Sequence, residues 1–327
     1  MNMRGTVALL ALVLTGCSTV ETLNKSEEQA AVMGNATPAA SPDANPDGKT
    51  QKIGASDIAI AGTTVASRDK TTLRFGSLTD LSATELTIDS ACGELTATDN
   101  TFVLPCAEKV FLIDAANPTL DTSVSGDKPF TTAVLTSDGT VIAGGSDRGD
   151  VTIFSNNETK TLALGRRSDQ LVRTPSDSIA VVDREQTSIQ GVLWQKPEPG
   201  AALRVGLGVG KVAPGDNDVV FAADTTADQL AVYTLDSVIR LHQTAPVADS
   251  PWDLAWDPTN DVVWVASTGT NTITAYGIET GVPEAKGTLK TISNVRSVEF
   301  SADGTLLIGS ETELQTIDAD TVKNALK

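Results

Sequence analysis

A turn sequence that recurs seven times constrains the fold of this chain more than any other feature. Each copy places a pair of turn-forming residues between two short apolar runs, and the first residues of successive pairs lie 37, 39, 38, 40, 43 and 44 residues apart. The pairs are Gly62-Thr63, Asp99-Asn100, Asp138-Gly139, Ser176-Asp177, Asp216-Asn217, Thr259-Asn260 and Asp303-Gly304. A period of about 40 residues predicts repeated copies of one supersecondary unit.

The unit is clearest between Ser250 and Gly281. Residues 252–256 alternate large apolar with polar or small side chains, as a half-buried strand does. Turn residues follow, and then residues 262–266 form a continuous apolar run, which indicates a strand covered on both faces. Residues 272–276 supply a third strand. Such a small sheet cannot bury both of its faces alone, so it requires neighbours of its own kind.

These observations predict an all-β chain folded as a seven-bladed β-propeller over residues 50–327. A pair of β-sandwiches would also show many short strands, but the even spacing argues against it. The last unit has three clear strands, so we expect a strand near Thr50 to Ile53 to complete it and close the ring. Residues 322–326 could instead form the fourth strand, or a short helix.

The N-terminus has the pattern of a secretory signal that ends at a lipidation site. Residues 1–4 carry one positive charge, and residues 6–14 are apolar but too few to span a bilayer. Leu14-Thr15-Gly16-Cys17 matches the bacterial lipobox, which implies removal of the signal peptide, residues 1–16, and attachment of acyl chains such as palmitate to Cys17. We therefore expect a lipoprotein anchored to the extracytoplasmic face of the cell membrane. Residues 17–49 comprise the lipidated cysteine and a polar, flexible linker.

Cys92 and Cys106 are the remaining cysteines, and each falls in an expected strand of one hairpin. Pairing across the turn between them brings them within a residue of facing each other. In an oxidising compartment this predicts a disulfide, which stabilises by roughly 3 kcal/mol in the chain-entropy model.

The formal net charge of −18 makes a polyanionic partner unfavourable. No segment shows the basic stripe that neutralises phosphates, so we expect no nucleic-acid binding.

Part of the repeat also resembles a known family. Residues 251–281 and 295–321 resemble the YVTN-type repeats of bacterial surface and periplasmic seven-bladed propellers, and residues 131–154 fit the same template less closely. With the lipobox, the whole chain resembles YncE-like propeller lipoproteins, including the actinobacterial prolipoproteins of the LppL group. It departs from WD40 repeats, because no unit carries their Gly-His and Trp-Asp pairs.

Few residues suit catalysis. His242 is the only histidine and falls on an expected outer strand, away from the ring axis, so a Ser-His-Asp triad and histidine metal sites are disfavoured. No calcium-binding loop is recognisable. Quinone-dependent propeller dehydrogenases carry a tryptophan in most blades, whereas three of the four tryptophans of this chain fall in one unit. We expect no catalytic residues, no metal and no cofactor.

The distribution of arginines gives the one candidate binding site. Loops from the second to the third strand, and from each blade to the next, share one face of a propeller. The residues expected on that face as ligand contacts are Arg68, Arg148, Arg184, Arg296 and Trp252. Guanidinium groups beside an indole suit an anionic or carbohydrate-like ligand. The opposing interpretation is that arginine is simply common in polar loops.

The expected function is therefore that of a membrane-tethered module or scaffold that binds a ligand or an envelope protein, more in keeping with binding than with catalysis. The alternative is a propeller hydrolase or lactonase with a carboxylate–arginine site at the channel mouth. Convergent carboxylates with a cation would favour the enzyme.

Overall fold

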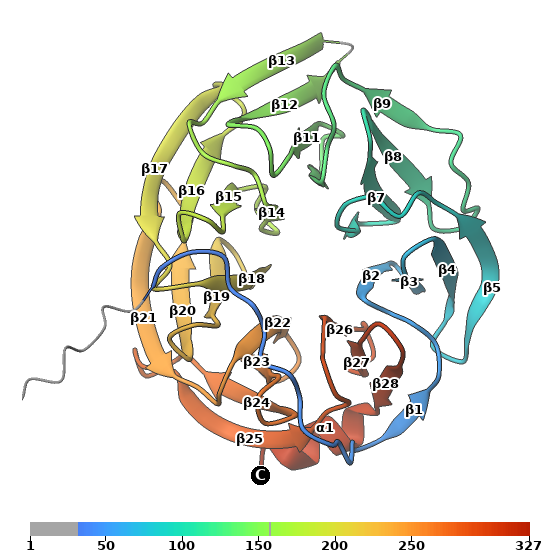
Figure 1. Cartoon of the computed structure of the whole chain (residues 1–327), viewed down its shortest axis with the longest axis vertical. Helices are drawn as coiled ribbons and strands as arrows, with labels where there is room; N and C mark the ends of the chain where they lie inside the picture. Colours follow the sequence, from blue (N-terminus) through green and yellow to red (C-terminus); the bar gives the residue numbers. More distant parts are fainter. Residues whose placement is uncertain (1–31, 157) are drawn as a thin grey trace, which may run out of the picture. The chain divides into compact units, whose positions relative to one another are not determined.

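Seven four-stranded antiparallel sheets are arranged as blades around a central axis, one blade for each copy of the turn (Figure 1). The computed structural model describes residues 32–156 and 158–327. The prediction of an all-β, seven-bladed propeller is confirmed. The predicted signal peptide and Cys17 lie outside the described residues.

Six blades use four consecutive strands, running outward from the axis (Figure 1). Blade 1 has β2 (Asp57–Ala61), β3 (Thr64–Arg68), β4 (Thr72–Ser77) and β5 (Asp80–Thr87). Blade 2 has β6 (Thr96–Thr98), β7 (Thr101–Cys106), β8 (Lys109–Asp114) and β9 (Ser123–Ser125). Blade 3 has β10 (Thr132–Leu135), β11 (Val141–Gly144), β12 (Asp150–Ser155) and β13 (Glu158–Ala163).

The next three blades repeat this order. Blade 4 has β14 (Gln170–Arg173), β15 (Ile179–Asp183), β16 (Ser188–Leu193) and β17 (Glu198–Arg204). Blade 5 has β18 (Val209–Pro214), β19 (Val219–Asp224), β20 (Gln229–Thr234) and β21 (Arg240–Pro246). Blade 6 has β22 (Pro251–Asp257), β23 (Val262–Ser267), β24 (Thr272–Gly277) and β25 (Glu284–Lys290).

Blade 7 closes the ring with a strand from the other end of the domain. It contains β26 (Ser297–Phe300), β27 (Leu306–Gly309), β28 (Leu314–Ile317) and, outermost, β1 (Lys49–Gln51). The pairs Lys49–Thr316, Thr50–Gln315 and Gln51–Leu314 join the last two strands. The predicted closing strand is confirmed. Of the two possibilities for the C-terminus the helix is observed, as α1 (Ala319–Ala325), whose first turn is capped by Asp318. Among the described residues, no helix is long and apolar enough to cross a membrane.

The apolar core is divided among the seven blade interfaces. Each of seven buried clusters takes its residues from two neighbouring blades, because alternate side chains of a strand point to opposite faces of its sheet. On β2, for example, Ala59 and Ala61 pack against blade 2, whereas Ile58 packs against blade 7. No blade therefore has a core of its own.

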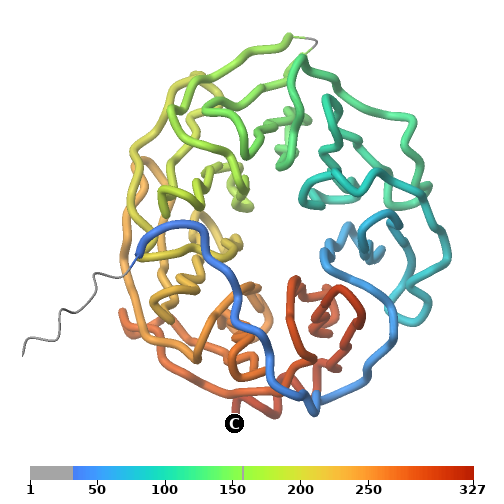
Figure 2. The backbone as a smooth tube through the Cα atoms, in the orientation of Figure 1, coloured from blue at the N-terminus to red at the C-terminus, as the bar shows by residue number. Residues whose placement is uncertain are grey.

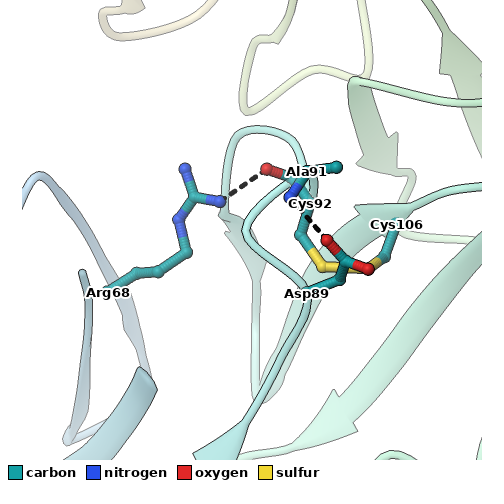
Figure 3. The surroundings of a disulfide bond; sticks show 5 residues. All are labelled: Arg68, Asp89, Ala91, Cys92 and Cys106. Atoms are coloured by element: carbon teal, nitrogen blue, oxygen red, sulfur yellow. Dashed lines mark hydrogen bonds between the residues drawn. A yellow bond between two sulfur atoms is a disulfide. The ribbon is translucent and has the colours of Figure 1, made fainter. Parts of the chain in front are cut away.

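The predicted disulfide between Cys92 and Cys106 is present (Figure 3). Cys106 ends β7 as expected, but the expectation that Cys92 lies in a strand is wrong. Cys92 belongs to the loop between β5 and β6, because the chain turns there to approach blade 3 and β6 begins only at Thr96. Arg68 of blade 1 donates a hydrogen bond of 2.6 Å to the Cys92 carbonyl, so the loop is also held to the neighbouring blade (Figure 3).

The chain before β1 lies on the propeller. Residues 32–48, here called the strap, cross one face from blade 4 to blade 7 (Figure 2). This is the face formed by the loops that join consecutive blades and the loops that join second to third strands. The described half of the predicted flexible linker is thus bound along the ring.

Candidate functional site

A cavity of about 260 Å³ lies on the axis, where the inner strands of the blades converge. Its charged and amide-bearing lining residues are Asp57, Glu94, Gln170, Arg173, Lys211, Asp253 and Glu299. All but Arg173 and Glu299 lie at or near the start of an inner strand, so most of the charge gathers towards the strap face.

Most blades are locked to the next one by a side chain at the start of the inner strand. In five blades this side chain accepts a hydrogen bond from a backbone N–H of the following inner strand. The five bonds, here called clasps, are Asp57 to Leu95 (2.7 Å), Thr132 to Leu171 (2.8 Å), Gln170 to Val212 (3.1 Å), Asp253 to Val298 (2.9 Å) and Ser297 to Ile58 (3.0 Å). A buried N–H left unpaired would cost about 1–3 kcal/mol, so each clasp fixes a blade interface.

Blades 2 and 5 depart from this rule. Their equivalent residues are Glu94 and Lys211, since the residue after each receives a clasp from the preceding blade. Lysine has no acceptor, so Lys211 cannot form a clasp, and the Leu254 N–H bonds to the Asp253 carboxylate instead (2.8 Å). Among the described residues, Glu94 forms no clasp either. The two side chains meet at 3.5 Å between Lys211 Nζ and Glu94 Oε1. Blades 2 and 5 therefore lack a clasp, and their residues at this position form an ion pair in the cavity instead.

The loop that carries Glu94 is fixed on several sides. The Gly93 N–H donates to the Pro105 carbonyl (2.8 Å), and the Glu94 N–H donates to the Thr131 carbonyl of blade 3 (3.0 Å). A side chain at position 93 would overlap that carbonyl, so only glycine allows the approach. Together with the disulfide at Cys92, these contacts fix the backbone position of Glu94.

Lys211 is a cation surrounded by carboxylates. Its Nζ lies 3.5 Å from both Glu94 and Asp253. Burial acts to lower its pKa, but the charges of Asp253, Glu94 and Asp57 outweigh burial and raise the pKa above its ordinary value. Lys211 therefore stays charged, which makes it unsuitable as a nucleophile or a proton acceptor.

The carboxylates of the cavity hold protons more tightly than usual. Burial raises the pKa of Asp57 to about 6, although Lys211 and Arg68 act against the shift. Burial likewise raises the pKa of Asp253. Asp57 faces Arg68, and Glu94 and Asp253 face Lys211, so charges of both signs are paired within the cavity.

Glu299 is a further carboxyl group of the cavity whose pKa is raised. It lies two residues beyond its clasp residue Ser297, where the other blades have only small or uncharged residues, namely Ala59, Thr96, Val134, Val172, Ala213 and Ala255. Among the described residues, no side chain donates a hydrogen bond to it. Burial, and then the charge of Asp253, raise the pKa of Glu299 to about 8. Its carboxyl is consequently a hydrogen-bond donor at neutral pH.

The predicted arginines lie on the strap face, and three of the four bind groups of the protein itself. Arg68 is 3.6 Å from Asp57 and also donates to Cys92. Arg184 donates to the Gly210 and Asp169 carbonyls and to Gln170 Oε1, at 2.9, 3.1 and 3.3 Å. Both stand at the edge of the axial cavity. Arg148 is buried within blade 3, where it pairs with Asp150 (2.5 Å) and covers the ring of Phe130.

Arg296 and Trp252 are brought together on the strap face. The Arg296 guanidinium lies 5.8 Å from the centre of the Trp252 ring, a cation–π distance. The indole N–H of Trp252 has no hydrogen-bond partner within the described part of the chain. A ligand role for this pair, and for the arginine set as a whole, stays a prediction.

His242 lies on the outermost strand of blade 5, exposed, with its Nε2 2.8 Å from the Thr234 hydroxyl. In residues 32–156 and 158–327, no group of three or more His, Cys, Asp or Glu is placed to hold a metal ion. The carboxylates of the axial cavity converge on a lysine and an arginine rather than on a vacant cation site.

Sequence reasoning did not identify Asp57, Glu94, Lys211, Asp253 or Glu299. A signal for the first four was present: every unit carries a polar residue five or six positions before its turn pair. Aligning the units on their turns would have revealed this column and the charges that break its pattern at Glu94 and Lys211.

Comparisons with known proteins show the fold. No family model matches the chain, and no curated protein sequence matches it. Membership of the YVTN-type, YncE-like or LppL groups therefore stays a prediction. Solved structures do match: the β-propeller domain of Myceliophteria thermophila Cps50 (Swd1) has a TM-score of 0.67 at 13% identity, covering 84% of this chain and 98% of that chain.

Two further structures are similar. A chain of the Mitotic Checkpoint Complex has a TM-score of 0.70 at 12% identity, covering 88% of this chain and 98% of that one. Streptogramin B lyase has a TM-score of 0.66 at 9% identity, covering 83% and 96%. At such low identity these likenesses establish the seven-bladed propeller fold and no particular activity.

Glu299 makes stability depend on pH in a defined direction. The folded protein holds the Glu299 proton more tightly than the unfolded chain does, because the pKa is raised from its ordinary value of 4.5 to about 8. The contribution of Glu299 to the free energy of unfolding is therefore fully present below about pH 4.5 and is lost as the pH rises to about 8. Replacing Glu299 with Gln removes this loss. At pH 4.5 we expect the melting temperature of Glu299→Gln to be equal to or lower than that of the wild type. At pH 8.5 we expect it to be a few degrees higher. The exposed Glu311→Gln variant is the control, and a constant difference across this range for Glu299→Gln would contradict the assignment.

Proposed function

We propose that this protein is a lipid-anchored, extracytoplasmic binding module whose axial cavity takes a small, hydroxyl-rich ligand. The observation that carries the proposal is the Glu94–Lys211 pair, which occupies two clasp positions without locking blades. The pair also contacts Gln170 and Asp253, so these charges lie among the polar groups of the cavity instead of on a backbone N–H. Residues that depart from the pattern of the other blades are expected at functional sites. The loop that carries Glu94 is held by the disulfide before a ligand binds, so binding would cost little conformational entropy in this loop.

The charges of the cavity favour one class of ligand. An anion would meet Asp57, Glu94 and Asp253, and the cations beside them, Arg68 and Lys211, are already paired with these carboxylates, so little positive charge is left to attract it. Hydroxyl groups can donate to these carboxylates and accept from Lys211 and from the protonated Glu299. A cavity of about 260 Å³ is below the usual range for drug-sized ligands, which begins at about 300 Å³, so a monosaccharide-sized molecule suits it.

A hydrolase is the second candidate function. It rests on Glu299, whose protonated carboxyl lies in the same cavity as ionised carboxylates, a combination that can divide acid and base roles. Unlike a metal-dependent lactonase, such an enzyme would transfer protons through carboxyl groups alone. Conversion of the bound ligand during the binding measurements below would favour this function over simple binding.

The membrane address depends on Cys17. Changing Cys17 to Ala should release the protein from the membrane fraction, because the acyl chains that anchor it could no longer be attached. Fractionation of cells, with metabolic labelling by a palmitate analogue, measures this directly. A Cys17→Ala protein that is still labelled and still sediments with membranes would show that the lipobox interpretation is wrong.

The ligand site depends on Lys211. Calorimetric titration with a panel of neutral monosaccharides should identify a ligand, and Lys211→Met should weaken its binding by about ten- to a hundredfold, the worth of a hydrogen bond to a charged group. Lys160→Met, which changes an exposed lysine, is the matched control. If no sugar binds, or if both variants bind the ligand as the wild type does, the axial cavity is not the site.

A further inference from the structure

The strap lies on a polar surface formed by Ser250, Thr268, Asn271, Ser293 and Asn294, here called the strap site. The contacts are densest at one dipeptide of the strap, Ser41-Pro42. Ser41 donates its hydroxyl to the Thr268 carbonyl (2.9 Å) and accepts a bond from the Asn294 N–H (2.7 Å). The Pro42 carbonyl accepts from the Asn271 amide (2.8 Å) and the Ser293 hydroxyl (3.0 Å). The contacts come from two loops, one in blade 6 and one between blades 6 and 7.

Contacts on either side of this dipeptide hold the strap extended. The Gly34 N–H donates to the Leu207 carbonyl (3.1 Å), and the Ala39 N–H donates to the Ser250 hydroxyl (2.8 Å). At the far end, Asp47 exchanges two hydrogen bonds with Lys290, at 3.1 and 2.7 Å. Most of the strap atoms that form these hydrogen bonds belong to the main chain. The strap site therefore recognises an extended backbone and the side chain of Ser41.

The side chains of two turns bind backbone atoms of the strap. Asn271 has a φ of 50°, and Thr187 and Asp228 at the same turn of blades 4 and 5 have φ values of 46° and 54°, so this conformation belongs to the turn itself. What the strap uses is the side chain there: the Asn271 amide binds the Pro42 carbonyl, and the Ser250 hydroxyl binds the Ala39 N–H.

The strap itself is weakly held by apolar contact. No residue from 32 to 48 is buried, and Val32 and Met33 are 79% and 50% exposed. Its attachment rests on hydrogen bonds that water can replace, so the strap can leave without disturbing the core.

We infer that the strap site is a peptide-binding site, occupied in cis by the strap and able to take an extended, serine-containing segment of a partner polypeptide in its place. This site is separate from the axial cavity, and the inference does not depend on the ligand proposed there. The strap acts as an intramolecular competitor, because tethering gives it an effective concentration in the millimolar range.

The test releases the strap by a substitution in the strap itself, so the residues of the strap site stay unchanged. In the full chain, Ser41→Glu replaces the recognised hydroxyl with a bulky charge and should release the strap, whereas Ala44→Glu adds the same charge at an exposed position of the strap and should not. The probe is a fluorescein-labelled synthetic peptide with the sequence of residues 36–47, followed by fluorescence anisotropy. Hydrogen exchange of the strap amides reports its release.

We expect the peptide to bind the Ser41→Glu chain at least tenfold more tightly than the wild-type or Ala44→Glu chains. Adding Asn271→Ala to Ser41→Glu removes the amide that donates to the Pro42 carbonyl, so it should abolish binding, as should Ser41→Ala within the peptide. Equal affinity for all chains would overturn the inference, and so would binding that persists with Asn271→Ala. A Ser41→Glu chain whose strap exchanges no faster than in the wild type would also overturn it, since Ser41 would then not hold the strap.

Discussion

The packing of each blade against its two neighbours is the constraint on which the rest of this structure depends. Every apolar cluster is shared between adjacent sheets, so no blade is stable without the blades beside it. The ring must therefore close, and it closes through the short β1, which supplies the outer strand of blade 7. Beyond the closure, α1 packs on the ring through Val322, which belongs to the cluster between blades 6 and 7.

The same packing brings seven inner strands to the axis, where stability and binding compete for the same positions. Five blades use a residue at or near the start of this strand as a clasp, which satisfies a backbone N–H of the next blade. Lys211 has no acceptor and cannot contribute in this way, and Glu94 pairs with Lys211 instead. Burying the two charges carries a desolvation cost that opposes their mutual attraction. A chain selected for stability alone would have placed an acceptor at position 211.

The architecture could be predicted from the sequence because it follows from local rules. Turn residues and alternating apolar runs recur in every unit, and the missing fourth strand of the last unit pointed to closure by residues near Thr50. The disulfide was predictable from two cysteines flanking one turn, although the strand position of Cys92 was not, because the approach of its loop to blade 3 is a tertiary contact.

The candidate site was less accessible to sequence reasoning, for physical reasons. Arginine and tryptophan are conspicuous in an acidic chain, yet Arg148 and Arg184 are bonded to groups of their own or the adjoining blade. Glu94 and Lys211 are far apart in the sequence and resemble ordinary surface charges. Their meaning emerges only when the ring brings them within 3.5 Å and shows which contact the other blades make there. The strap was taken as a linker because its composition is that of a flexible segment, whereas its binding depends on side chains of distant loops.

The account claims that the axial charges serve binding rather than the ring itself, and a double replacement tests this most directly. Changing both Glu94 and Lys211 to Gln removes the ion pair and gives blade 5 the same side chain that forms the clasp in blade 4. Thermal unfolding of this variant should show a midpoint equal to or above that of the wild type, because a clasp replaces a buried ion pair. A midpoint lowered as far as that of Thr132→Val, which deletes an existing clasp, would show that the pair holds the blades together and would contradict the account.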